Sequence, residues 1–146
     1  MRRLLTACAL LSLTGCLDPG DPLLDVRDTT APTVQSTDPA ANGQIATDGT
    51  LNITFSEYMD VRTLRPGIAV FLGRDPNEVP LSITVPAPTD GDEDVERGDI
   101  PYTVMVKAST PFTANSSYLL VVRTSITDYE GNALANEVRI PFRTGP

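Results

Sequence analysis

The sequence predicts an all-β fold, an antiparallel β-sandwich of about seven strands. Short runs rich in β-branched and aromatic residues recur from residue 32 onward, and clusters of Gly, Pro, Asn and Asp separate them. No segment shows a sustained helical period. Regularly spaced short strands with turn signals between them are typical of sandwiches, so we expect one domain of this class.

The expected strands are short apolar runs bounded by turn residues. Thr50–Phe55 is the clearest, because its apolar residues alternate with polar ones in the period-2 pattern of a half-buried strand. Tyr102–Lys107 shows the same alternation, and Tyr118–Arg123 is the most apolar run of the set. The remaining four expected strands are Thr33–Thr37, Ile68–Leu72, Leu81–Val85 and Val138–Phe142.

One helical turn is expected between the second and third strands. Ser56–Leu64 carries the helical pattern, with Ser56 as its N-cap, and the Pro66-Gly67 pair should end it. Two other prolines, Pro101 and Pro141, lie beside or inside expected strands. Because proline has no N–H to donate to a ladder, each should mark a sheet edge or a strand start.

The first 16 residues have the layout of an export signal. Two arginines precede an apolar run from Leu4 to Leu13, about half of the roughly 20 residues that a membrane-spanning helix needs. The run ends at Leu13-Thr14-Gly15-Cys16, which resembles the lipobox of bacterial lipoproteins. The resemblance implies that the Cys16 thiol receives a diacylglyceryl group, that the signal is cut before it, and that the new amino group is acylated. The alternative, a core helix ending in Gly-Cys, has no helical partner downstream.

Cleavage before Cys16 sets the expected organisation. Residues 1–15 would be a signal peptide, 16–28 an acylated cysteine and flexible tether, and 29–146 the domain. Cys8 would leave with the signal and Cys16 would be a thioether, so no disulfide is expected. The mature chain would carry 9 basic and 19 acidic residues. This acidic balance argues against binding to nucleic acid or anionic lipid, so acyl chains would have to hold the protein at the membrane.

A series of motifs runs through the domain in a recognisable order. They are Pro32, Asp38-Pro39-Ala40, Phe55-Ser56-Glu57-Tyr58-Met59, Tyr118, the segment DYEGNALA at 128–135, and Phe142-Arg143-Thr144. The series is similar to the bacterial Ig-like domains of the SbsA type (Big_5), over about residues 29–144. This resemblance implies an Ig-like sandwich. It also implies a structural or adhesive role, because such domains usually occur as spacers or adhesive modules of surface proteins.

The motif residues are expected to have mainly structural roles. Tyr118 follows a polar turn and opens an apolar strand, as in a tyrosine corner, so its ring should be buried and its hydroxyl should bond a nearby backbone group. Asp128 should bond backbone amides within its own loop, where Gly131 and Asn132 suit positive φ. The residues expected in the core are Phe55, Met59, Leu120, Val122 and Phe142.

The composition leaves few groups for catalysis. Histidine is absent, which excludes His-based triads and imidazole acid–base chemistry. Lys107 is the sole lysine, and its strand pattern places it at the solvent face. A hydrolase that uses paired carboxylates is a remote third class of function, and we expect no enzyme.

One acidic segment is a candidate metal site. It places four carboxylates at alternate positions, which could converge on calcium through oxygen ligands, at Asp90, Asp92, Asp94 and Glu96. It begins like an EF-hand loop, but Val95 replaces the required glycine and Pro101 stands where the bidentate Glu should be. The alternative is a solvated acidic loop that limits association. A second, weaker oxygen cluster comprises Asp128, Glu130 and Asn132.

These observations lead to one expected function and one alternative. We expect a lipid-anchored, non-catalytic module with a structural, adhesive or protein-binding role. Leu17, rather than aspartate, follows Cys16, and in lipoproteins sorted by the enteric rule this implies the outer membrane of a Gram-negative bacterium. Its partners would be the membrane, through the anchor, and another envelope protein or a polysaccharide. The alternative is a calcium-stabilised recognition domain for carbohydrate or a surface protein that uses the 86–100 loop.

Overall fold

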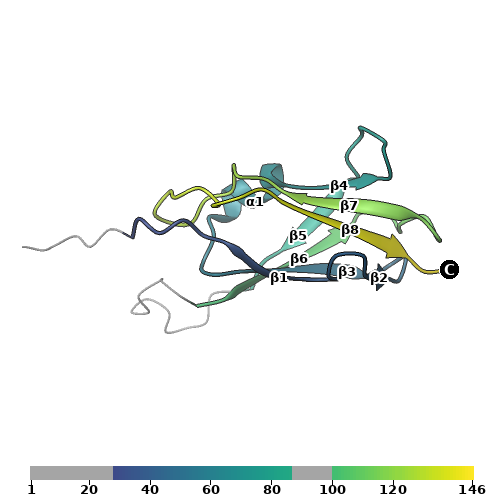
Figure 1. The fold of residues 1–146 in the computed structure, drawn as a ribbon, viewed down its shortest axis with the longest axis horizontal. Helices are drawn as coiled ribbons and strands as arrows, with labels where there is room; N and C mark the ends of the chain where they lie inside the picture. Colours follow the sequence, from purple (N-terminus) through teal and green to yellow (C-terminus); the bar gives the residue numbers. More distant parts are fainter. Residues whose placement is uncertain (1–27, 87–99) are drawn as a thin grey trace, which may run out of the picture.

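A computed structural model of the chain, which describes residues 28–86 and 100–146, shows two four-stranded sheets packed face to face (Figure 1). One sheet has the strand order β1-β3-β6-β5 and the other β2-β8-β7-β4. The prediction of an Ig-like all-β sandwich is confirmed. The elements are β1 (Val34–Asp38), β2 (Gln44–Ile45), β3 (Thr50–Phe55), α1 (Val61–Gly67), β4 (Ile68–Leu72), β5 (Leu81–Thr84), β6 (Tyr102–Ala108), β7 (Ser117–Val122) and β8 (Val138–Thr144).

All seven expected strands are present, with ends at most two residues from those expected. The sequence reasoning missed β2, because two residues in a turn-rich segment are too short to show a period. This strand pairs in parallel with the end of β8, whereas the other strand pairs are antiparallel. It is therefore the one exception to the expected antiparallel architecture among the described strands.

The expected helix is present but begins later than expected. Its N-cap is Asp60, whose side chain accepts a hydrogen bond from the Arg62 N–H at 3.0 Å. The Ser56 hydroxyl instead accepts from the Thr33 N–H at 3.0 Å. The helix ends with the Pro66-Gly67 pair, as expected, and includes both residues.

Glycine is required at the end of α1 because the backbone lies close to a neighbouring side chain. A Cβ atom on Gly67 would come within 2.1 Å of Cγ1 of Ile126, which is fully buried. The helix therefore packs directly on the 123–137 connection. In the described segments, no helix has the length and apolar composition needed to cross a membrane.

The two strand prolines occupy the positions that the sequence predicts. Pro101 immediately precedes β6. Pro141 lies inside β8, where its carbonyl accepts from the Asn42 N–H at 2.6 Å and the neighbouring Arg143 N–H donates to the Gly43 carbonyl at 2.9 Å. Odd-numbered residues of β8 thus direct their backbone groups away from β7. Pro141 therefore removes no donor from the β7–β8 ladder.

The core lies between the sheets and contains every residue expected there. Phe55, Met59, Leu120, Val122 and Phe142 are at most 1% exposed. Tyr118 is also buried, and its hydroxyl accepts from the Thr113 N–H at 2.8 Å, which confirms the tyrosine corner. Its ring stacks on Phe142, with 5.5 Å between the ring centroids.

Replacing Tyr118 by Phe should lower the stability of the domain. The change leaves the Thr113 N–H without its acceptor while the ring keeps its packing. We expect the free energy of unfolding to fall by about 1 kcal/mol and the melting temperature by a few degrees, measured by thermal unfolding. The control Tyr58→Phe removes a hydroxyl from a half-buried ring that packs on Tyr102. Equal losses in the two variants would show that the corner bond contributes nothing specific.

Candidate functional site

The sites that the sequence predicts most directly lie outside the described residues. These are the lipidation site, Cys16, and the calcium ligands Asp90, Asp92, Asp94 and Glu96. Both stay predictions. Within residues 28–86 and 100–146, no group of three or more His, Cys, Asp or Glu side chains is arranged to hold a metal ion.

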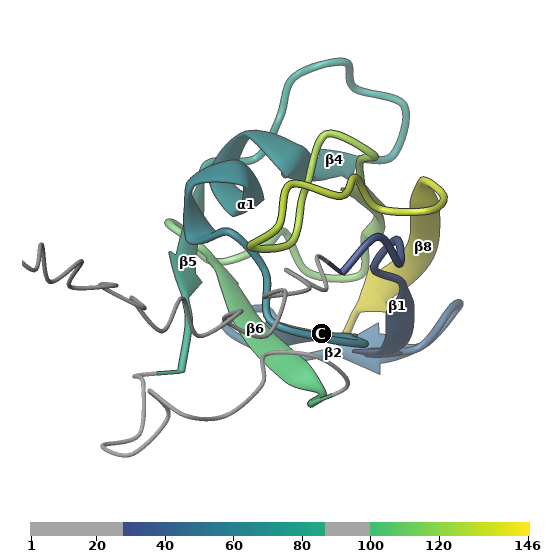
Figure 2. The same ribbon diagram turned by 90° about the vertical axis from the view of Figure 1, so that its left-hand side faces the viewer.

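Most of the buried polar chemistry of the described chain lies at one end of the sandwich, which we call the N-terminal pole. It comprises residues 28–33, 56–63 and 126–135, and Figure 2 looks onto this end. Backbone bonds join its parts: the Asp60 N–H donates to the Thr127 carbonyl and the Ala135 N–H donates to the Pro32 carbonyl, each at 2.9 Å. The chain thus enters the domain through a segment that is already fixed to the pole.

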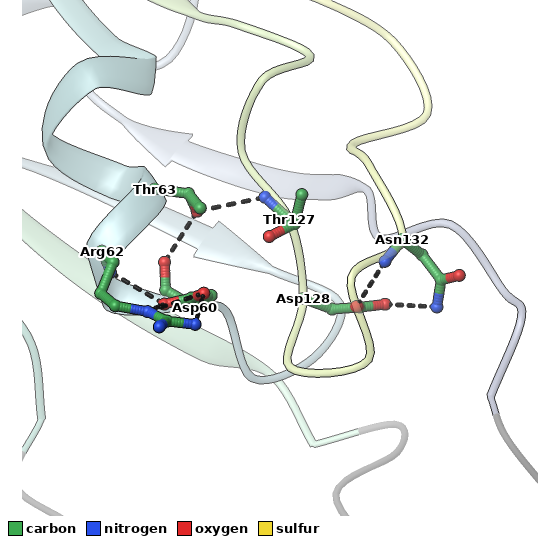
Figure 3. Close-up of polar contacts among 6 residues, drawn as sticks. All are labelled: Asp60, Arg62, Thr63, Thr127, Asp128 and Asn132. Atoms are coloured by element: carbon green, nitrogen blue, oxygen red, sulfur yellow. Dashed lines mark hydrogen bonds and ion pairs between the residues drawn. The ribbon is translucent and has the colours of Figure 1, made fainter.

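Asp128 organises the loop at the centre of this pole. Its two carboxylate oxygens accept from the backbone N–H and the side-chain amide of Asn132, each at 2.8 Å (Figure 3). This confirms that Asp128 bonds a backbone amide within its loop. Gly131 adopts positive φ as expected, but Asn132 does not. The Asn132 side-chain amide instead stabilises the loop by donating to the Asp128 carboxylate.

The bonds of Asn132 argue against the second oxygen cluster. Its amide nitrogen donates both to Asp128 and, at 3.0 Å, to the Asp28 carbonyl. Asn132 therefore turns a donor rather than an oxygen ligand toward the Asp128 carboxylate. Asp128, Glu130 and Asn132 do not form a calcium cage in this structure.

The start of α1 is fastened to the same loop through hydroxyl and carboxylate groups. The Thr63 hydroxyl donates to the Asp60 carbonyl at 2.7 Å and accepts from the Thr127 N–H at 3.1 Å (Figure 3). The Asp60 carboxylate accepts from the Arg62 guanidinium at 2.7 Å. This side-chain bond, together with the backbone bond from Arg62, lowers the pKa of Asp60. These groups hold the helix in place.

Glu57 is the residue of this pole that the sequence reasoning missed. It is only 5% exposed. Phe55, two residues before it, and Met59, two residues after it, are fully buried, so all three follow one period-2 pattern of inward-facing side chains. Met59 forms an antiparallel bridge with Asp128, which places Glu57 beside the 128–130 loop. Continuing the period-2 pattern of β3 beyond its end would have revealed this inward acid.

Burial is the main cause of the raised pKa of Glu57. Repulsion from the Asp128 carboxylate raises it further, with smaller contributions from Asp28 and Glu130. The Ser56 hydroxyl, which donates to Glu57 at 3.3 Å, acts in the opposite direction. The fold therefore disfavours the charged form of this side chain.

Glu57 should make the domain less stable as the pH rises. Because its folded-state pKa lies above the unfolded value near 4.5, the folded state binds the proton more tightly. The contribution of the protonated Glu57 to the free energy of unfolding is fully present below that value. It is lost as the pH rises through the folded-state pKa. Glu57→Gln should raise the melting temperature at pH 7 and reduce its dependence on pH between 4.5 and 7.

The matched control for this prediction is Glu137→Gln. Glu137 carries the same charge, but it lies at the surface, where its pair with Arg139 should contribute little. Melting temperatures of both variants would be measured across the pH series. A Glu57→Gln profile that runs parallel to that of Glu137→Gln would contradict the assigned role of Glu57.

A shallow hollow lies at the opposite end of the sandwich. It has a volume of about 180 Å³ and is lined by Thr47, Asp48, Gly49, Lys107, Ala108, Ser109 and Pro111. Lys107 is exposed, as expected from its strand pattern. Most of the lining residues are also exposed, so the hollow provides no dry environment for chemistry.

Solved structures of the S-layer protein SbsC resemble this fold. The chain superposes on the S-layer protein rSbsC(31-844) with a TM-score of 0.52 and 15% identity, over 80% of this chain and 14% of that one. For the N-terminal part of the bacterial S-layer protein SbsC the TM-score is 0.52 and the identity 16%, over 80% and 24% of the two chains. Identities this low support the fold alone.

The sequence itself supports the assignment to a family. No curated protein matches the chain. The sequence model of the bacterial Ig-like domain family matches residues 28–144, which is most of the chain. This match includes the tyrosine corner and all three segments of the N-terminal pole, and the chain belongs to the bacterial Ig-like domain family.

Proposed function

We propose that this chain is a lipid-anchored, non-catalytic Ig-like module of the cell envelope, with a structural, adhesive or protein-binding role. The observation that carries the proposal is the order of its parts. A lipobox-like LTGC ends at Cys16, and the Ig-like match begins at residue 28. The short segment between them would join the lipid directly to the domain, on the outer membrane of a Gram-negative bacterium.

The described side chains support a role without catalysis. Asp60 and Asp128 use their carboxylates to hold backbone and side-chain donors. Lys107 is exposed on a strand, and the chain contains no histidine. The likeness to two structures of one bacterial S-layer protein, SbsC, supports placing the module at the envelope.

The placement of the two ends supports presentation of the far side of the domain. The described chain enters at the N-terminal pole and reaches residue 146 at the opposite end (Figure 1). An anchor at Cys16 would hold the first pole toward the membrane. The connections at the far end, around residues 46–49 and 109–116, would then face the envelope partner, whether protein or polysaccharide.

Cys16→Ser should abolish the anchor. A hydroxyl does not replace the thiol in the expected lipidation, so the variant should stay unprocessed or become soluble, and it should not incorporate labelled palmitate. Membrane fractionation and metabolic labelling of the full chain would measure this. The control Cys8→Ser removes the other cysteine and should leave both readouts unchanged. If Cys16→Ser fractionates with membranes like the parent, acylation is not the anchor.

Calcium stabilisation of a recognition domain is the second candidate function. The alternating acids Asp90, Asp92, Asp94 and Glu96 favour it. Calcium at 100 times its Kd should add about 2.7 kcal/mol to the free energy of unfolding, several degrees in melting temperature. The double variant Asp92→Asn, Asp94→Asn should lose this gain. Equal melting temperatures in millimolar calcium and in chelator would eliminate the candidate.

A further inference from the structure

The two ends of the described chain lie at opposite poles, so tension between them acts along the strands. The chain enters at residues 28–33 and leaves beyond β8 at the far end (Figure 1). Both β1 and β8 run from the entry pole toward the exit pole. A pull on the two ends therefore draws β1 and β8 in opposite directions along their own axes.

The connection between β1 and β2 is short and internally bonded. It spans residues 39–43, and the Gly43 N–H donates to the Ala40 carbonyl at 2.8 Å. Its first residue, Pro39, is buried, and its carbonyl accepts from the Thr37 hydroxyl at 3.0 Å. Tension on β1 would consequently reach β2 with little slack.

β2 in turn is bonded directly to the C-terminal strand. We call residues 42–45 and 141–145 the β2–β8 clamp. The Asn42 N–H donates to Pro141, Arg143 to Gly43, and Gly145 to Ile45, at 2.6, 2.9 and 2.9 Å. In this parallel pair, Gln44 is opposite Arg143. The clamp therefore links β2, and through it β1, to the C-terminal strand β8 by hydrogen bonds.

The end of β8 is held on its other side as well. The Thr144 N–H donates to the Ser116 carbonyl at 3.0 Å, and the Thr144 hydroxyl accepts from the Ser116 N–H at 3.0 Å. The same hydroxyl donates to the Thr113 carbonyl at 2.6 Å. Thr144 is 3% exposed. These contacts hold the last residue of β8 to the 113–116 turn, immediately before β7.

The direction of pulling decides how these bonds fail. When two paired strands are drawn past each other along their axes, the bonds between them share the force and must break together. When one strand is lifted from its end, the same bonds break one at a time. Bonds that share the force therefore raise the barrier to unfolding. A higher barrier lowers the unfolding rate, which governs forced unfolding.

We propose that this domain is built to resist tension between its two ends, and that the β2–β8 clamp sets its resistance. This goes beyond an anchored binding module, because it assigns the domain a mechanical function. It stands on the strand directions and bonds alone and does not depend on lipidation of Cys16.

Single-molecule force spectroscopy of the full chain tests the proposal. Handles at residues 28 and 146 would shear the clamp, whereas handles at residues 74 and 146 would peel β8. Residue 74 follows β4, and the preceding Gly73 N–H donates to the carbonyl of Ser117, which pairs with Arg143 near the end of β8. We expect a clearly higher unfolding force for the first pair. Equal forces in the two geometries would overturn the proposal, and this comparison needs no substitution in the clamp.

Arg143→Pro tests the clamp itself. It removes the donor to Gly43, while the β7–β8 ladder keeps its bonds, because residue 143 faces away from β7. Loss of one shared bond should raise the unfolding rate at constant end-to-end force roughly 3- to 10-fold. Peeling through residue 74 should change less.

Two controls separate the clamp from other effects. Arg139→Pro also introduces a proline into β8 at a position whose backbone groups face away from β7, but β2 does not pair with residue 139. Arg143→Ala removes the same side chain and keeps the N–H. Both should unfold at nearly the parental rate under end-to-end force. If Arg139→Pro accelerates unfolding as much as Arg143→Pro, the clamp does not set the resistance. Should Arg143→Pro fail to fold, the two pulling geometries of the parent still decide.

Discussion

The packing of the two sheets against each other is the constraint on which the rest of this domain depends. The chain has two cysteines, both before residue 17, and no tryptophan, so no disulfide and no indole ring joins the described sheets. The sheets are held by inward-facing apolar side chains, and each of β3, β6 and β7 must keep its alternation in phase with the facing sheet. A shift of one residue in any of them would turn its apolar side chains toward solvent.

This constraint extends beyond the strands. The inward phase of β3 continues past Phe55 to Glu57 and Met59, so the same rule that buries two apolar residues also buries a carboxylate between them. The chain accommodates Glu57 with the Ser56 hydroxyl at 3.3 Å, although Asp128 lies close enough to raise its pKa. Glu57 is thus buried because the inward phase of β3 continues into the segment that packs against the Asp128 loop.

The features that the sequence predicts well are those set by local pattern. Thr50–Phe55 and Ile68–Leu72 are strands with the expected bounds, since alternation or an apolar run specifies a strand directly. Tyr118 was recognisable because a polar turn precedes an apolar strand. In contrast, β2 exists only because β8 is beside it, and no property of Gln44-Ile45 alone predicts that pairing. Tertiary contact, rather than propensity, forms such a strand.

The choice of helix cap shows the same limit. Ser56 and Asp60 are both good caps by type, and the local sequence favoured the first. The structure uses Ser56 to bond Thr33, a contact 23 residues away, and leaves Asp60 to cap α1. The candidate site was predictable to a similar degree. The Asp128 loop follows from its own turn residues, whereas the burial of Glu57 depends on how the loop meets the end of β3.

Pro141 shows how the edge of the second sheet is controlled. β2 covers β8 only near its end, so the outer side of β8 offers backbone groups to any other strand. Proline at 141 removes the donor on that side, while its carbonyl still accepts from Asn42. Arg139 and Arg143 place charged side chains on either side of it, which further discourages edge pairing. The outer side of β8 is thus unfavourable for pairing with another chain, although Pro141 and Arg143 still bond to Asn42 and Gly43. The two-residue strand β2 therefore pairs with β8 where the edge allows it.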